Sequence, residues 1–215
     1  MKNIVFDFDG VLADSLDTII EITNRVGGEY GLPRLDRGGV RAMGLTGLMR
    51  MSKISTLRLP FFVRKIRLGL AEMMGQVPLH QGMASVVSEL ARYFNLGILT
   101  SNSQDNVNRF LEHHSLRRHF SYLFCGSSLF AKHESAVELI KAKGLDRSES
   151  IYVGDEVRDI VAMKKAGLPI MAVSWGFESE ELLRPHGPDF FARTPEEFLE
   201  IAQGWRAANE SAALR

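Results

Sequence analysis

The chain has 215 residues with a formal net charge of zero, 45% hydrophobic residues and a single cysteine. This length suffices for one core domain, the zero net charge argues against nucleic acid as a partner, and the apolar stretches are too short to cross a membrane. Because Cys125 cannot form an internal disulfide and no signal peptide precedes the first strand, we expect a protein of the reducing cytoplasm without a cysteine-rich zinc site.

The first predicted strand, residues 4–8, leads directly into two aspartates. Asp7 and Asp9 should project to the same side, because side chains alternate along a strand, and Gly10 allows the backbone to turn away. The pattern Asp-x-Asp-Gly also occurs in ordinary turns. It is not typical of an EF-hand calcium loop here, because such a loop would need further oxygen ligands and a closing glutamate. Because neighbouring carboxylates repel each other, a divalent metal would leave one as ligand or nucleophile and the other as acid or base.

The next segment, residues 15–79, is predicted to be an inserted, all-helical cap domain. Residues 16–30 have helical periodicity, and the stretch that follows contains several glycines and no convincing strand. An insertion that returns near His80 would lie above the ends of the strands. We expect residues 41–47 to form a flexible loop that points into the site. The predicted domains are 1–14 with 80–215 for the core and 15–79 for the cap.

Positive charge is concentrated in this predicted cap. Between Pro33 and Gly69 there are nine basic residues and one acid, Asp36, so this window carries plus eight and the rest of the chain minus eight. A solvated helical surface explains the pattern, and so does a positively charged lid that attracts an anionic substrate toward an acidic site.

After residue 80 the chain alternates helix and strand with short connections. This alternation predicts a mostly parallel sheet that helices cover on both faces, with an active site at the carboxyl ends of the strands. Residues 4–8 would join as the first strand and residues 189–192 as an edge strand. The expected helices are 83–94, 104–114, 135–142, 159–166 and 196–205, and the strands between them are 96–99, 122–125, 150–153 and 170–173.

Two further strand ends carry polar side chains. Thr100 follows a buried strand, and Ser101 and Asn102 lead into a helix, where their N–H groups either cap that helix or bind an anion. Asp155 follows the strand 150–153, and Asp159 comes four positions later, a spacing that places both on one side of the helix turn.

Lys132 stands before a helix between these two motifs, and taken alone it is typical of a surface lysine. In this combination and order, the motifs resemble the haloacid dehalogenase superfamily, in particular its phosphatase branch with a helical cap after the first strand. The resemblance covers nearly the whole chain and includes Ala166 and Gly167 at the end of the helix that follows Asp159. Many relatives have Lys-Pro where this chain has Lys132-His133, and Lys141 or Lys143 is the alternative.

The resemblance implies a Rossmann-like three-layer core and a magnesium-dependent phosphatase. Its substrate would be a small phosphorylated metabolite, such as phosphoglycolate or a sugar phosphate. Asp7 would attack phosphorus and form an aspartyl-phosphate, while Asp9 protonates the departing alcohol and later removes a proton from water. A dehalogenase needs no acid for its leaving group, so Asp9 argues against dehalogenation.

The resemblance also assigns the metal and phosphate ligands. Mg²⁺ would be held by the carboxylates of Asp7 and Asp155 and by the backbone carbonyl of Asp9, with Asp159 or Glu156 acting through water. The phosphoryl oxygens would be bound by Thr100, by the N–H groups of Ser101 and Asn102, and by Lys132, which offsets their charge.

Two alternative functions stay open at this point. A phosphomutase would use the same core residues and differ in how well the cap excludes water. A binding or regulatory protein would use the fold without turnover, but the intact set of Asp7, Asp9, Lys132 and Asp155 argues against it, because clustered carboxylates are costly to maintain without metal or substrate.

Overall fold

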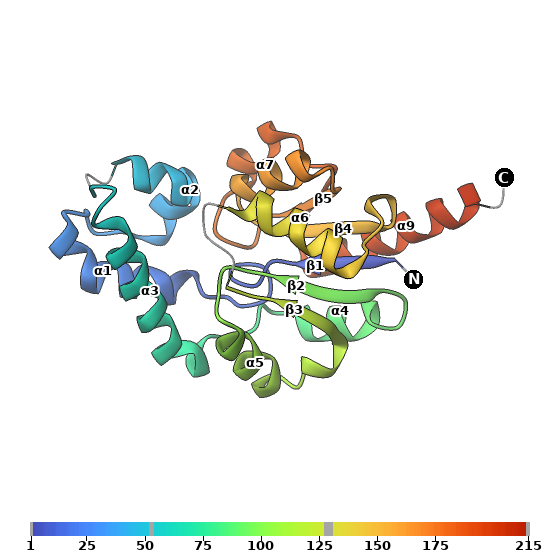
Figure 1. Ribbon diagram of the computed structural model, residues 1–215, viewed down its shortest axis with the longest axis horizontal. Helices are drawn as coiled ribbons and strands as arrows, with labels where there is room; N and C mark the ends of the chain where they lie inside the picture. The colour runs from blue at the N-terminus through green and yellow to red at the C-terminus, as the bar shows by residue number, and fades with distance from the viewer. Residues whose placement is uncertain (1, 52–53, 127–130, 214–215) are drawn as a thin grey trace.

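The computed structural model describes residues 2–51, 54–126 and 131–213 (Figure 1). Within these residues the strands are β1 Asn3–Phe6, β2 Asn95–Leu99, β3 Phe120–Phe124, β4 Ser150–Gly154, β5 Ile170–Val173 and β6 Phe190–Ala192. They form one sheet in the order β3-β2-β1-β4-β5-β6, and every neighbouring pair is parallel. The predicted parallel α/β fold is therefore confirmed.

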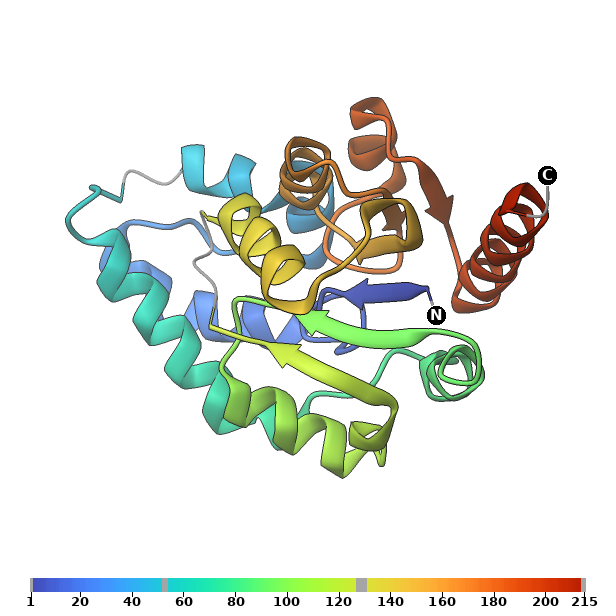
Figure 2. The same cartoon turned by 45° about the vertical axis from the view of Figure 1, so that its right-hand side comes forward.

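Helices cover both faces of this sheet, as predicted. One face carries α4 Met83–Leu90, α5 Gln104–His113 and α9 Pro195–Ala213, and the other carries α6 Lys132–Lys143, α7 Val157–Ala166 and the short α8 Glu180–Leu183. Figure 2 shows α6 and α7 on one side of the strands and α5 on the other. Single 3₁₀ turns lie at Gly28–Tyr30, Met74–Gln76, Arg117–His119, Arg147–Glu149 and Arg184–His186.

The side chains of β1 explain why the sheet is the centre of the molecule. Ile4 and Phe6 pack into the core on the α4, α5 and α9 face, whereas Val5 packs into the core on the α6 and α7 face. All three are fully buried, as expected for a central strand of a parallel sheet.

Several predicted bounds are wrong by more than one residue. β1 ends at Phe6 rather than at residue 8, because the carbonyl of Phe8 accepts hydrogen bonds from the N–H groups of Leu12 and Ala13 and the chain turns there. The helix expected over 83–94 ends at Leu90, and α9 runs beyond residue 205. Helix α6 begins at Lys132, which brings the lysine into the helix itself.

The segment between Ser15 and Leu79 contains α1 Leu16–Gly27, α2 Arg37–Met51 and α3 Leu59–Met73. These helices lie beyond the carboxyl end of β1, away from the body of the sheet (Figure 1). Two short connections join them to the sheet, where Ala13 pairs with Leu79 and the N–H of His80 donates to the carbonyl of Leu12. The division into a cap over 15–79 and a core over the remainder stays a prediction. Among the described residues, no helix is both long and apolar enough to cross a bilayer.

The loop predicted over residues 41–47 is wrong, because these residues belong to α2. The helical backbone breaks only at Gly44, which has φ 66° and ψ 170°. Glycine adopts this conformation without steric cost, so the break is confined to one residue and the chain resumes a helix after it. A Cβ at this position would collide with the carboxylate of Glu178, which places the break against the core.

Arg41, one of the basic residues of the window 33–69, fastens α2 to the loop that follows β5. Its guanidinium donates hydrogen bonds to the carbonyls of Ser174 at 2.6 Å and Gly176 at 2.5 Å, and the carbonyl of Arg41 accepts one from the N–H of Ser179 at 2.9 Å. The positive charge of Arg41 is therefore used to hold backbone carbonyls.

Replacing this arginine tests the contact. Arg41→Lys keeps the charge but cannot present a planar fork to several carbonyls at once, so we expect the free energy of unfolding to fall by about 1–3 kcal/mol in urea titrations. Arg64→Lys, on the exposed face of α3, is the matched control and should change it by less than about 0.5 kcal/mol. Equal effects of the two substitutions would contradict the role of Arg41.

Candidate active site at the carboxyl ends of the strands

Side chains from three neighbouring strands and one helix meet at one edge of the sheet. Asp7 follows β1, Thr100 follows β2 and Asp155 follows β4, and these strands are adjacent in the sheet. Lys132 comes from the first turn of α6. All four are buried, with exposed fractions of 4%, 1%, 0% and 6% respectively. The parallel topology thus gathers polar groups that are far apart in the sequence.

The ammonium group of Lys132 lies between two carboxylates. It forms an ion pair with Oδ2 of Asp7 and a second with Oδ1 of Asp159 at 2.5 Å. Burial by itself lowers the pKa of Lys132, but attraction to Asp159 and Asp7 outweighs burial and leaves that pKa raised. The alternative lysines, Lys141 and Lys143, are exposed near the other end of α6. Lys132 is the lysine that the fold brings to Asp7.

Asp155 lies in a cradle of backbone atoms. Its Oδ2 accepts a hydrogen bond from the N–H of Phe177 at 2.7 Å. A Cβ at either Gly10 or Gly176 would collide with this carboxylate, so both positions need glycine for the close approach. Its Oδ1 is buried and has no hydrogen-bond partner among the described residues. A buried carboxylate oxygen without a partner is costly unless a ligand completes it.

Three carboxylates lie close together at this edge. Asp7, Asp155 and Asp159 each offer an oxygen, and these oxygens lie within 4.8 Å of one another. Burial raises the pKa of Asp7 to about 7 and raises that of Asp155 well above its ordinary value. An all-oxygen, negatively charged donor set of this kind fits Mg²⁺, which would favour the ionised form of both groups.

Asp159 has other partners that limit its role. Its Oδ2 accepts hydrogen bonds from the N–H groups of Asp155 and Glu156, both at 3.2 Å, and its Oδ1 contacts Lys132. Glu156 and Asp159 cap the first turn of α7 reciprocally. With both oxygens engaged, Asp159 is better placed to position its neighbours than to bind a cation directly.

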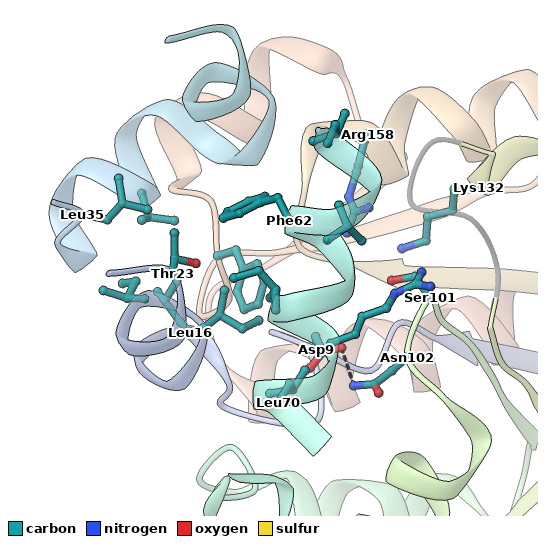
Figure 3. A pocket seen from close by; sticks show the side chains of 18 of the residues that line it. Asp9, Leu16, Thr23, Leu35, Phe62, Leu70, Ser101, Asn102, Lys132 and Arg158 are labelled. Carbon is teal, nitrogen blue, oxygen red and sulfur yellow. Dashed lines mark hydrogen bonds between the residues drawn. The ribbon is translucent and has the colours of Figure 1, made fainter. Parts of the chain in front are cut away.

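The side chain of Asp9 does not belong to this group of three carboxylates. Its Oδ1 accepts a hydrogen bond from the hydroxyl of Ser15 at 2.9 Å, and its Oδ2 accepts one from the side-chain amide of Asn102 at 3.0 Å (Figure 3). Burial raises the pKa of Asp9, although both hydrogen bonds oppose the shift. The two aspartates of the first motif therefore have different surroundings.

Residues 100–103, which follow β2, form a hydrogen-bonded turn and then the N-cap of α5. The N–H of Asn102 donates to the hydroxyl oxygen of Thr100 at 3.0 Å, so this N–H already has a partner. The N-cap of α5 is Ser103, whose hydroxyl accepts a hydrogen bond from the N–H of Asn106 at 3.2 Å. Neither Thr100 nor Ser101 is thus needed to cap the helix.

A cavity of about 460 Å³ opens beside the strand ends, with Asp9, Asn102 and Lys132 among its lining residues. Asp9, Ser101, Asn102, Lys132 and Arg158 line its polar end, and Figure 3 shows the labelled side chains of this end facing the space beside α3. The cavity extends from the strand ends to the helices of residues 16–73. A bound molecule would therefore touch both parts of the chain.

The loop after β5 contributes to the site, which was not predicted from the sequence. Gly176 and Phe177 hold Asp155, and Oε2 of Glu178 accepts a hydrogen bond from the N–H of Val157 at 2.6 Å. The position of this loop could have indicated its role, because residues 174–178 follow the carboxyl end of a predicted parallel strand, where site residues are expected. Arg158 was within a recognised motif, but nothing in its spacing indicated that it would line the cavity.

The cradle predicts an effect of one added methyl group. Gly176→Ala should displace the Asp155 carboxylate and weaken Mg²⁺ binding at least about tenfold, measured by titration calorimetry. Gly28→Ala is the matched control, because a Cβ there meets nothing within 4 Å, and its affinity should equal that of the wild type. Unchanged binding by Gly176→Ala would mean that Asp155 is not a ligand.

The buried Glu178 predicts a pH-dependent stability. Burial raises its pKa from 4.5 to about 7. The folded protein then keeps a proton that the unfolded chain has released, so this stabilising contribution is complete below pH about 4.5 and is lost as the pH rises through about 7. Without divalent cations, Glu178→Gln should therefore gain up to about 3 kcal/mol over the wild type as the pH rises.

Glu138→Gln, at an exposed position of α6, serves as the control for this measurement. Its difference from the wild type should stay constant across the same pH range. If Glu178→Gln also shows a constant difference, Glu178 does not titrate in this range.

Comparisons with known proteins show the family and the fold of this chain. A family model described as haloacid dehalogenase-like hydrolase matches residues 4–173. A phosphoglycolate phosphatase of Synechococcus elongatus is 31% identical over 204 residues, covering 93% of this chain and 96% of the relative. An N-acetylmuramic acid 6-phosphate phosphatase of Pseudomonas putida is 27% identical, covering 82% and 84%. The crystal structure of a predicted phosphatase from Clostridium acetobutylicum has a TM-score of 0.83 at 21% identity, covering 94% and 98%.

Proposed function

We propose that this chain, which belongs to the haloacid dehalogenase-like hydrolase family and is a phosphatase, uses Mg²⁺ to hydrolyse a small organic phosphate monoester through an aspartyl-phosphate. The observation that carries the proposal is the buried contact of Lys132 with Asp7, beside an Asp155 oxygen that lacks a partner. This arrangement supplies a nucleophile, a cation and a metal ligand next to a cavity that Lys132 lines.

Asp7 is the proposed nucleophile. Its Oδ1 accepts a hydrogen bond from the N–H of Phe8 at 2.8 Å, and its Oδ2 contacts Lys132, so both oxygens are oriented. The ammonium favours the ionised carboxylate in a buried site that otherwise opposes it. It also offsets the charge that accumulates when a phosphate group approaches.

The carboxylates of Asp7 and Asp155 and the backbone carbonyl of Asp9 are the proposed ligands of Mg²⁺, which when bound neutralises charge on the phosphoryl group. Asp159 acts through water and through Lys132, since its own oxygens are already engaged. The acidic cluster supports this assignment.

Asp9 is the proposed general acid and base. Ser15 and Asn102 fix its carboxyl group from two sides, and the side chain lines the cavity where a leaving alcohol would lie. A raised pKa favours the protonated form, which can donate to the departing oxygen and afterwards accept a proton from water.

Thr100 and Ser101 are the proposed phosphoryl-binding residues of the second strand end, together with Lys132. The hydroxyl of Thr100 accepts from the N–H of Asn102 and keeps its own proton for donation. The N–H of Asn102 would have to leave Thr100 to bind phosphate, so we assign Asn102 chiefly to the positioning of Asp9.

The relatives support a small phosphorylated metabolite as substrate, since one is named for phosphoglycolate and another for N-acetylmuramic acid 6-phosphate. The complete acidic set argues against a non-catalytic role, and no described residue favours a phosphomutase. A cytoplasmic location stays a prediction.

Hydrolysis of p-nitrophenyl phosphate tests the proposal. We expect magnesium-dependent release of p-nitrophenol and at least about a thousandfold loss of kcat in Asp7→Asn, because the amide is a poor nucleophile. Asp105→Asn, at an exposed position of α5, is the control and should retain full activity. Acid quenching should trap a phosphorylated wild-type chain and no phosphorylated Asp7→Asn chain.

Removing divalent cations tests whether the activity depends on Mg²⁺. EDTA should abolish activity and Mg²⁺ should restore it, whereas Ca²⁺ should not, because its looser coordination misplaces Asp7 relative to phosphorus. A wild-type protein that is inert toward a broad panel of phosphate esters with Mg²⁺ would refute the proposal.

A further inference from the structure

The cavity that opens on Asp9 and Lys132 has two chemically different ends. Its polar end lies at the strand tips. Its other end lies along the first and third helices, where Figure 3 shows Leu16, Phe62 and Leu70 at the cavity wall. The lining side chains of this second end, which we call the apolar wall, are Leu16, Ile19, Phe62, Val63, Ile66 and Leu70.

The apolar wall is a continuous stripe on each helix. Leu16 and Ile19 on α1, and Phe62, Val63 and Ile66 on α3, are spaced three and four residues apart and so share one face of each helix. In most helix pairs, apolar faces of this kind are buried entirely against each other. Here they also line a cavity, which leaves apolar surface available to an occupant.

The opening is not a general separation of the two helices. A Cβ at Gly69 on α3 would lie 2.8 Å from the Ile22 side chain on α1, so the helices are in close contact at this point. Tyr30 and Phe62 also pack edge to face, with ring centroids 5.1 Å apart. The cavity is therefore a defined feature beside a packed helix pair.

The basic residue that α3 contributes to the cavity belongs to the polar end. Arg67 lines a neighbouring cleft of about 250 Å³ together with Ser101 and Asn102, which places it near the strand tips. The apolar wall itself contains no charged side chain. A carboxylate placed against it would lose its hydration without gaining a partner.

The volume also exceeds what a very small substrate needs. About 460 Å³ corresponds to roughly fifteen water molecules at about 30 Å³ each. A substrate as small as phosphoglycolate, with its phosphate at the polar end, would leave the space beside the apolar wall unfilled. An apolar group in the same place would gain about 25 cal/mol for each Å² removed from water.

We propose that the alcohol released by this phosphatase carries an apolar body, an alkyl or aryl group, that lies against the apolar wall while its phosphate lies at Asp7. The inference rests on the proposed function and narrows its substrate class. In the reaction a carboxylate oxygen of Asp7 bonds to phosphorus as the ester P–O bond breaks, and the departing alcohol takes a proton from Asp9. Water, which returns a proton to Asp9, then breaks the bond between Asp7 and phosphorus and supplies the new oxygen of inorganic phosphate. Phe62 and Val63 then determine specificity.

A matched series of esters tests the inference. Ethyl, butyl and hexyl phosphate have leaving groups of nearly equal reactivity and differ in apolar length. With Mg²⁺ and phosphate release as the assay, we expect kcat/KM to rise at least about tenfold from ethyl to hexyl phosphate. We also expect kcat/KM for hexyl phosphate to exceed that for phosphoglycolate.

Phe62 and Val63 on α3 provide the test variants, and the adjacent Phe61 provides the control. Val63→Thr keeps the shape of the side chain but replaces one methyl group with a hydroxyl, so the hexyl-to-ethyl ratio of kcat/KM should fall about fivefold. Phe61→Ala is the control, because Phe61 is 65% exposed, and it should leave the ratio unchanged. Phe62→Leu should also lower the ratio. A substitution that merely loosened the fold would lower both rates and leave the ratio the same.

The outcomes separate the two proposals. Efficient hydrolysis of phosphoglycolate, with no gain from ethyl to hexyl phosphate, overturns the inference and leaves the proposed function intact. A gain with chain length that Val63→Thr does not reduce also overturns it, because the apolar wall is then not the binding surface. Failure to hydrolyse any ester overturns both.

Discussion

The arrangement of acidic side chains at the strand ends depends on one buried ammonium group, which lies between two carboxylates. Lys132 contacts both Asp7 and Asp159 in a site from which water is largely removed. Without the ammonium, these acids and Asp155 would repel one another at short range, and burial would drive them to their protonated forms. Removing one partner of such a set leaves an uncompensated buried charge, so the fold and the chemistry constrain the same residues.

A single loop connects this charge cluster to the helices above it. The N–H of Phe177 binds Asp155, and the carbonyl of the preceding Gly176 accepts a hydrogen bond from Arg41 on α2. Glu178 reaches the start of α7 and packs against the break at Gly44. The loop that holds a proposed metal ligand is therefore in direct contact with α2.

Periodicity and strand-end chemistry predicted much of this molecule. The alternation after residue 80 gave the parallel sheet, and parallel topology alone implies that Asp7, Thr100 and Asp155 lie at one edge. Contacts between distant segments were not predictable in this way. The partners of Gly176 and the break at Gly44 depend on how the helices of residues 16–73 pack against the core. The local sequence does not determine this packing.

In the proposed mechanism, Asp7, Asp155 and Lys132 converge on one metal ion and one phosphoryl group. A crystal structure of the protein grown with Mg²⁺ and vanadate tests it most directly. We expect an ion about 2.0–2.1 Å from carboxylate oxygens of Asp7 and Asp155, with vanadium beside Asp7 and the ammonium of Lys132 still in contact. An ion bound elsewhere, or vanadate distant from Asp7, would contradict it.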